Sequence, residues 1–296
     1  MERDTGLSKD TLRVWERRYG FPQPLRDVNG ERVYPPDQVD KLRLLKRLMD
    51  QGHRPGKIAE QSVEHLLALA EAGNARSGPP ASVPEPDDAL RSFLQLVTDH
   101  RVDELRRDLA LLTVKLGLAR FVTEVMAPLT SLVGDAWARG ELAIFEEHLY
   151  TESVQAVLRN AVTTIPRAGD SPRVLLTTVP QEHHGLGVLM AEAMFALEGA
   201  RCIPLGVRTP VMEIVRCADS QPIDIVALSY SPVVNPYQVV ESLKELRAQL
   251  PAATELWAGG SSPVLKRRAP TGVRVLDQLD EVGPAVARWR AEHRHA

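Results

Sequence analysis

After Pro166 the sequence alternates between short apolar runs and helical stretches, a rhythm that leaves few possible folds. The apolar runs have the length of strands and are Val174–Thr178, Arg201–Leu205, Ile223–Ser229, Glu255–Ala258 and Val273–Leu276. The helical stretches between and after them lie around residues 187–199, 210–219, 236–249 and 279–293. Strands that alternate with helices in this way are typical of a parallel, doubly wound sheet. The sequence therefore predicts an α/β domain over residues 167–296.

The composition indicates a globular protein of two or three domains. The chain has 296 residues, of which 44% are hydrophobic and 25% are charged, and its formal net charge is −3. No run of 18 apolar residues occurs and no basic-then-apolar signal sequence opens the chain, so we expect no membrane partner and a cytoplasmic location. Cys202 and Cys217 are too few for a disulfide framework and lack CxxC spacing, which suits a reducing compartment.

Two further segments precede the α/β domain. Residues 74–86 are rich in Pro, Ser and Ala with almost no large apolar side chain, which predicts a flexible linker after a small module at 1–73. Residues 87–166 carry apolar side chains at helical spacing, interrupted at Gly140. Four helices in this length predict a four-helix bundle.

The N-terminal module begins with a basic helix. Ser8 is a good N-cap, Gly20 is a helix stop signal, and Arg13, Arg17 and Arg18 lie between them on overlapping faces. Such a helix can enter a major groove, although many surface helices carry three arginines without binding DNA. Further on, Asn29-Gly30 signals a tight turn flanked by Arg26, Arg32 and Tyr34, which predicts a small β-wing against the DNA backbone.

The whole string over about residues 4–60 closely resembles the winged helix–turn–helix of MerR-type transcription regulators. The resemblance implies that operator DNA is a partner. Only Met1–Asp4 precede the "TGLS" segment, where such domains usually have a short strand and a full first helix, so we expect either that the sequence starts late or that the first helix is shortened. The DNA-binding residues expected are Lys9, Arg13, Trp15, Arg17, Arg18, Arg32 and Tyr34.

A second unusual stretch, "TVPQEHHGLG" at residues 178–187, follows the first strand of the α/β domain. Loops at the carboxyl edge of a parallel sheet are where ligands bind. Glu182 and His184 are two residues apart, and a carboxylate behind an imidazole fixes its tautomer and strengthens it as a metal ligand. Gly187 would let a bulky group approach the backbone. A solvated histidine pair is the plainer alternative, and zinc is disfavoured because no Cys/His set of zinc spacing accompanies the loop.

The domain around this loop resembles the cobalamin-binding Rossmann-like domain. That family has D-x-H-x-x-G after its first strand, S-x-L after its third and Gly-Gly after its fourth. This chain has Glu182 in place of the aspartate, Ser229 without the leucine, and Gly259-Gly260. The resemblance implies that His184 ligates cobalt from below and that Ser229 and the glycines accommodate the nucleotide tail. His183 is the competing ligand, but its spacing to Gly187 does not match.

The helical segment adds the pattern W-x(9)-E-H, formed by Trp137, Glu147 and His148. On residues alone, a core tryptophan and a solvated Glu-His pair are the more common explanation. The pattern matches the CarH/LitR light-sensing regulators, which join this helical cap to a MerR-type head. The resemblance implies that the three residues contact the adenosyl group of adenosylcobalamin. The best-known members have a histidine directly after the tryptophan, where this chain has Ala138.

From the resemblance we expect a light-responsive transcriptional repressor that is not an enzyme. With adenosylcobalamin in the dark it would form a homo-oligomer, expected to be a tetramer, and bind operator DNA; light would release it. The alternative is a light-independent sensor of cobalamin, or of another tetrapyrrole attached through Cys202 or Cys217. A cobalamin-dependent enzyme is disfavoured, because three modules already fill the chain and leave no room for a substrate barrel.

Overall fold

The computed structural model describes residues 7, 9–26, 30–50, 53–66, 69, 88–166, 169 and 171–293. Contacts divide the chain into two compact units, Met1–Asp87 with Gly134–Ile144 and Asp88–Val133 with Phe145–Ala296. The predicted N-cap Ser8, the turn residue Asn29, the start before the "TGLS" segment and the linker 74–86 lie outside the described residues. The domain bounds drawn from the sequence stay predictions.

In its described residues the N-terminal module contains the helices α2 (Lys9–Tyr19), α3 (Pro36–Asp50) and α4 (Pro55–Ile58), and residues 63–66 are helical as well. Their apolar sides form one core, whose buried members include Leu12, Trp15, Leu42, Leu45, Leu48, Ile58 and Leu66. Between α2 and α3 the strands β1 (Leu25–Arg26) and β2 (Arg32–Val33) pair antiparallel. Gly30 between them has a φ of +78°, the left-handed conformation that a tight turn needs and glycine adopts readily.

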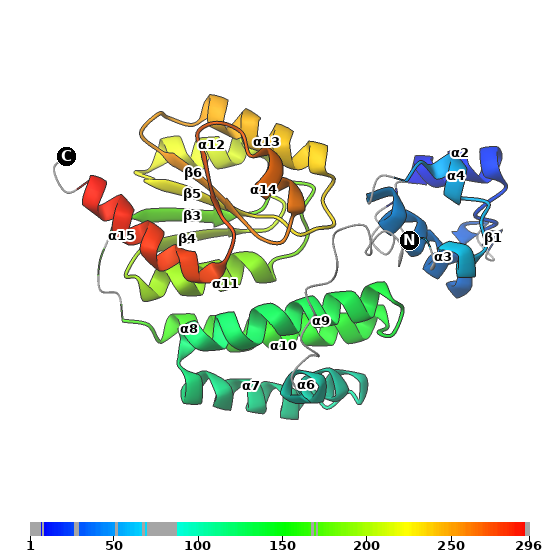
Figure 1. Cartoon of the computed structure of the whole chain (residues 1–296), viewed down its shortest axis with the longest axis horizontal. Coiled ribbons are helices and arrows are strands. Elements are labelled where there is room, and N and C mark those ends of the chain that lie inside the picture. The colour runs from blue at the N-terminus through cyan, green and yellow to red at the C-terminus, as the bar shows by residue number, and fades with distance from the viewer. Residues whose placement is uncertain are drawn as a thin grey trace. The chain divides into compact units, whose positions relative to one another are not determined.

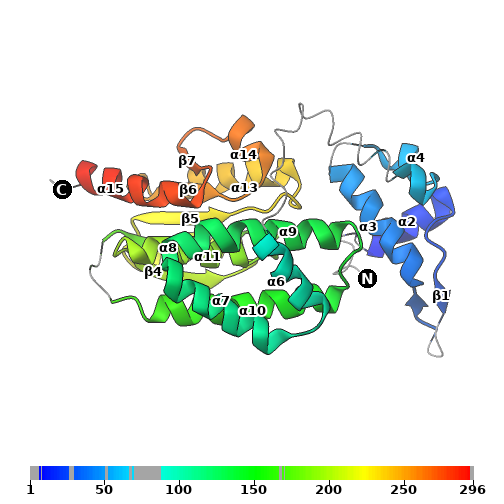
Figure 2. The same cartoon turned by 60° about the horizontal axis from the view of Figure 1, so that its bottom comes forward.

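The helical segment contains α6 (Asp88–Thr98), α7 (Val102–Leu116), α8 (Leu118–Arg120), α9 (Ala127–Ala138) and α10 (Ile144–Thr163). A π-helical stretch, η1 (Phe121–Met126), joins α8 to α9 and was not predicted from the sequence. Partly buried polar contacts connect the helices as well as apolar ones: Thr130 and Tyr150 share a 2.8 Å hydrogen bond, and Arg106 donates to Ser153 at 3.3 Å. Figure 2 shows these helices in the foreground.

The C-terminal part contains one five-stranded sheet, as predicted. Its strands are β3 (Arg173–Thr177), β4 (Arg201–Gly206), β5 (Ile225–Ser229), β6 (Glu255–Gly259) and β7 (Val273–Leu276). Their order is β4-β3-β5-β6-β7, and every neighbouring pair is parallel. Helices α11 (Leu186–Leu197) and α15 (Val282–Glu292) cover one face, and α12 (Val211–Ser220) and α13 (Pro236–Gln249) cover the other (Figure 1). The sequence did not predict the short helix α14 (Pro263–Arg268) or the 3-10 turn η2 (Leu279–Glu281) as separate elements.

The strand order creates a topological switch point at the carboxyl edge of this sheet, where doubly wound folds have a crevice. The chain leaves β3 toward β4 on one side and leaves β5 toward β6 on the other, so the loops after β3 and β5 diverge between these two strands. Ligands of doubly wound proteins bind at such a point, outside the carboxyl ends of the strands. On the side of the sheet that α11 covers, α8 and η1 lie against this helix.

None of the helices in the described part of the chain is long and apolar enough to span a bilayer.

Candidate functional site

A buried carboxylate lies at this crevice. Glu182, in the loop after β3, has only 1% of its surface exposed. One of its oxygens, Oε2, accepts a hydrogen bond from the backbone N–H of Ser231 at 2.5 Å, and Ser231 follows β5. The other, Oε1, accepts from the backbone N–H of His184 at 2.9 Å. Glu182 thus joins the two loops that diverge at the crevice.

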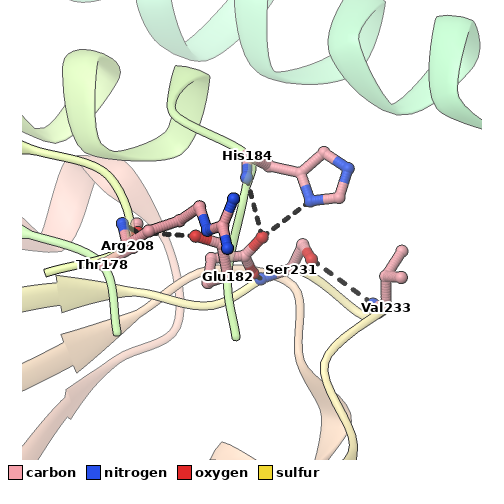
Figure 3. Close-up of polar contacts among 6 residues, drawn as sticks. All are labelled: Thr178, Glu182, His184, Arg208, Ser231 and Val233. Atoms are coloured by element: carbon pink, nitrogen blue, oxygen red, sulfur yellow. Dashed lines mark hydrogen bonds and ion pairs between the residues drawn. The ribbon is translucent and has the colours of Figure 1, made fainter. Parts of the chain in front are cut away.

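The same oxygen of Glu182 holds the His184 imidazole. His184 Nδ1 lies 2.6 Å from Glu182 Oε1, and 55% of the His184 side chain is exposed (Figure 3). No described residue makes a hydrogen bond to Nε2 of this ring. A carboxylate on Nδ1 places the proton there and leaves Nε2 with its lone pair, the arrangement found behind metal-bound histidines. No carboxylate of the described residues makes a hydrogen bond to His183, which favours His184 as the ligand.

The electrostatics of the pair are mutual. Burial would raise the pKa of Glu182, but hydrogen bonds and charge from His184 and the N–H of Ser231 outweigh it and lower the pKa. For His184, the Glu182 hydrogen bond raises the pKa against the effect of burial, and the charges of Glu182 and Glu147 raise it further. The neighbouring His183 responds in the opposite sense: burial and the positive charge of Arg208 lower its pKa.

The predicted glycine and serine residues meet at the same edge. Ser229 ends β5 and is the register partner of Gly259, the last residue of β6. A Cβ atom on Gly187 would lie 2.3 Å from Ser229 Oγ, so only glycine lets α11 pack this closely against that hydroxyl. Gly260 has a φ of +109°, and a Cβ there would lie 2.2 Å from the carbonyl oxygen of Tyr230.

Two residues of this site were missed by the sequence analysis, Thr178 and Arg208. The buried Thr178 hydroxyl donates to the Glu182 carbonyl at 2.8 Å and accepts from the backbone N–H of Arg208, also at 2.8 Å. It therefore fixes the loop after β4 to the loop that carries His184. Thirty residues separate the pair in sequence, and neither belongs to a recognisable motif.

The helical segment contributes a second Glu-His pair. Glu147 lies in the first turn of α10 and His148 follows it, with His148 Nδ1 2.7 Å from Glu147 Oε2. Thr151 holds the other oxygen of Glu147 at 2.7 Å. The charge of Glu147 contributes to the raised pKa of His184, so this carboxylate lies within electrostatic range of the histidine loop. Trp137 is half-buried in the last turn of α9, which ends at Ala138.

In the N-terminal module, Lys9, Arg13, Arg17, Arg18 and Arg32 are exposed, as residues that contact DNA must be. Tyr34 is half-buried against the core, and burial raises its pKa. The prediction for Trp15 is wrong: it has 4% of its surface exposed and contacts Tyr19 edge-to-face at 6.2 Å. Its indole completes the core beneath α2 and cannot reach a DNA groove.

The residues at the sheet edge fit a corrinoid. His184 supplies an imidazole nitrogen with a fixed tautomer, the donor that cobalt accepts from proteins. Val207 and Val233, 42% and 46% exposed, flank the histidine loop and offer apolar surface to a flat macrocycle. The close approach at Gly187 keeps the Ser229 hydroxyl at the mouth of the crevice.

Comparison with known proteins identifies the N-terminal module and the helical segment of this architecture. A family model described as MerR HTH family regulatory protein matches residues 1–61, and one described as B12 binding domain matches residues 89–161. The chain is 30% identical over 260 residues to the HTH-type transcriptional repressor CarH of Myxococcus xanthus, covering 87% of this chain and 86% of that protein. It is 29% identical over 290 residues to the HTH-type transcriptional repressor CarA of the same organism, covering 97% and 93%.

Among solved structures, the monomethylamine corrinoid protein of Methanosarcina barkeri is similar in fold. Its TM-score is 0.54 at 13% identity, over 67% of this chain and 96% of that one. A MerR-type head at residues 1–61, a helical segment that matches the B12 binding domain at residues 89–161, and a parallel sheet after it define a class of DNA-binding transcription regulator. Within that class, the chain belongs to the CarH family.

Proposed function

We propose that this protein is a transcriptional repressor that binds adenosylcobalamin in the dark and leaves its operator in the light. The observation that carries the proposal is the Glu182–His184 pair, in which a buried carboxylate holds Nδ1 at 2.6 Å at the switch point of the sheet. A solvated histidine would not need a partner that is 1% exposed and tied to a second loop. Such a partner is useful when the imidazole must keep one tautomer and one direction.

In this proposal the sheet edge holds the cofactor from below. His184 would ligate cobalt through Nε2, and Glu182 would hold the ring in place. Ser229 with the glycines Gly187, Gly259 and Gly260 would make room for the nucleotide tail. When bound, adenosylcobalamin would supply a cobalt–carbon bond that light can break.

The helical segment, which we propose to be a four-helix bundle, would cover the other face of the cofactor. Trp137, Glu147 and His148 are the residues that would contact the adenosyl group. His148 is 70% exposed and its Nδ1 is engaged by Glu147, so only its Nε2 is available to a ligand. Ala138 has no donor atom, so the position after the tryptophan cannot take over a vacated coordination site in this chain.

The N-terminal module would bind DNA through the exposed arginines of α2 and the β1–β2 hairpin. Arg13, Arg17 and Arg18 would contact phosphates and base edges in the major groove, and Arg32 would contact the backbone. Joining several heads in one oligomer, which we propose to be a tetramer, would raise operator affinity through effective concentration. The protein would act by binding in the cytoplasm and not as an enzyme.

A second function of the same fold is favoured by Ala138 alone. Without a histidine at this position, the protein could sense the presence of cobalamin, or of another tetrapyrrole, independently of light. Both functions use His184 and the DNA-binding head. They differ in whether light changes the DNA-bound fraction of protein that already carries cofactor.

The experiment that tests the proposal combines spectra and operator binding. Purified protein is mixed with adenosylcobalamin in darkness, then exposed to green light, and its absorption and operator mobility shift are recorded at each stage. We expect a protein-bound adenosyl spectrum and a shifted operator in the dark, and loss of both after light. A shift that needs cofactor but ignores light would establish the cofactor sensor instead. Absence of any cofactor binding would overturn both functions.

A further inference from the structure

Arg208 is held in a conformation that needs an explanation. Its φ is +61°, the left-handed region that an arginine rarely occupies. Its backbone N–H donates at 2.8 Å to the buried hydroxyl of Thr178, which itself donates to the Glu182 carbonyl. The next residue, Thr209, donates its N–H to the carbonyl of Thr178 at 2.9 Å. Hydrogen bonds thus hold the strained loop against the segment that carries His184. Backbone strain of this kind is common at ligand-binding sites.

The side chain of Arg208 has no anionic partner within the described chain. It forms no ion pair there, and the one hydrogen bond of the residue is made by its backbone. The nearby carboxylate of Glu182 is already used, because Oε1 serves His184 and Oε2 serves Ser231. Figure 3 shows the guanidinium projecting across the loop that carries Glu182 and His184, rather than away from it.

A guanidinium in this position offers five N–H donors and no acceptor. Its natural ligand is therefore a group rich in oxygen acceptors that lies beside the His184 imidazole. The exposed Val207, next to it in the same loop, offers apolar surface on the same side. Val207 and Arg208 together suit a large ligand with a flat apolar ring and oxygen atoms on its periphery. Val207 would contact the ring, and the guanidinium of Arg208 would contact the oxygen atoms.

We propose that Arg208 is a recognition residue for the bound corrinoid and donates hydrogen bonds to oxygen acceptors on its periphery. These acceptors come from two sources, the phosphodiester of the nucleotide loop and the amide carbonyls of the ring side chains. The inference rests on the proposed cofactor. It assigns a binding role to the loop after β4, in which none of the expected cofactor residues lies.

The test uses full-length protein with Arg208→Gly. Glycine removes the side chain and accepts the positive φ, so the variant should fold at least as well as the wild type. Arg216→Ala is the matched control, because Arg216 is 77% exposed in the adjacent helix α12 and pairs with Glu213 at 3.0 Å. Dissociation constants for cobalamin and for cobinamide, which lacks the nucleotide loop and its phosphate, are measured in the dark by absorption titration.

We expect R208G to raise the Kd for cobalamin about tenfold to a hundredfold, the range of one charge-assisted hydrogen bond, with R216A unchanged. An equal loss with cobinamide would assign the amide carbonyls, and a loss confined to cobalamin would assign the phosphodiester. If the wild type binds and R208G binds equally well, the inference is wrong while the proposed function stands. An unchanged Kd with weaker self-association in size-exclusion chromatography would place Arg208 between copies of the chain, and it would also overturn the inference. If the wild type binds neither corrinoid, the inference falls with the proposed function.

Discussion

The contact between Gly187 and Ser229 gives the sharpest prediction from the packing of the site. In Gly187→Ala the new Cβ would lie 2.3 Å from Ser229 Oγ but 3.5 Å from Ser229 Cβ. The first distance is a clash and the second is an ordinary contact, so the hydroxyl alone must move. Overpacking of this kind costs about 1–3 kcal/mol, and replacing a helical glycine by alanine returns up to about 1 kcal/mol. We therefore expect G187A to lower the free energy of unfolding by up to about 3 kcal/mol.

The Ser229→Ala background isolates the cause. Without the hydroxyl, the nearest atom to the new Cβ is at 3.5 Å, so Gly187→Ala should become neutral or slightly stabilising. The double-mutant cycle then gives a coupling free energy of about 1–3 kcal/mol. Urea unfolding of the wild type, both single variants and the double variant, followed by circular dichroism, measures it. A coupling below about 0.5 kcal/mol, the scatter of independent sites, would refute this account of why residue 187 is glycine.

Three further predictions follow from the charges and the core. Glu182→Gln should lower the pKa of His184, measured by NMR titration of the imidazole, because the carboxylate that favours the charged ring is gone. Because Glu182 raises the pKa of His184 in the folded state, the charged imidazole stabilises the fold at pH values below the pKa of the unfolded state, about 6.5. This stabilisation is lost as the pH rises through the pKa of the folded state. An unchanged His184 titration in E182Q would contradict this account. Trp15→Ala should destabilise the N-terminal module by about 3–5 kcal/mol, since its indole is 4% exposed. Arg17→Ala should change stability by less than about 0.5 kcal/mol and reduce the salt dependence of DNA binding by about one ion; the reverse pattern would mean that Trp15 and not Arg17 faces the DNA.

The sequence predicted the sheet well because apolar residues repeat at different periods in strands and in helices, and loop residues separate these elements. All five strands lie within two residues of the predicted ranges, and their parallel order follows from the helical connections. The E-x-H-x-x-G spacing also placed Glu182 and His184 correctly in the loop after β3, since a two-residue offset lets the carboxylate reach both the backbone and the ring.

Other features depend on contacts that no local pattern records. The prediction for Trp15 failed because three arginines around an aromatic residue do not tell which side of the helix faces the core. The π-helical stretch Phe121–Met126 has the apolar spacing of an ordinary helix, so nothing in its composition distinguishes it. The link between Thr178 and Arg208 arises only because β3 and β4 are neighbours in the sheet.

The central claim is that the nitrogen below cobalt comes from His184. The most direct measurement is the electron paramagnetic resonance spectrum of the protein loaded with cob(II)alamin in the dark, prepared from cells grown on heavy nitrogen, whose nuclear spin differs from that of the natural isotope. Coordination by His184 predicts that the nitrogen splitting changes from a triplet to a doublet in labelled protein, and that no doublet appears in labelled His184→Ala. A triplet that persists in labelled wild-type protein would show that the cofactor keeps its own base, and would contradict the claim.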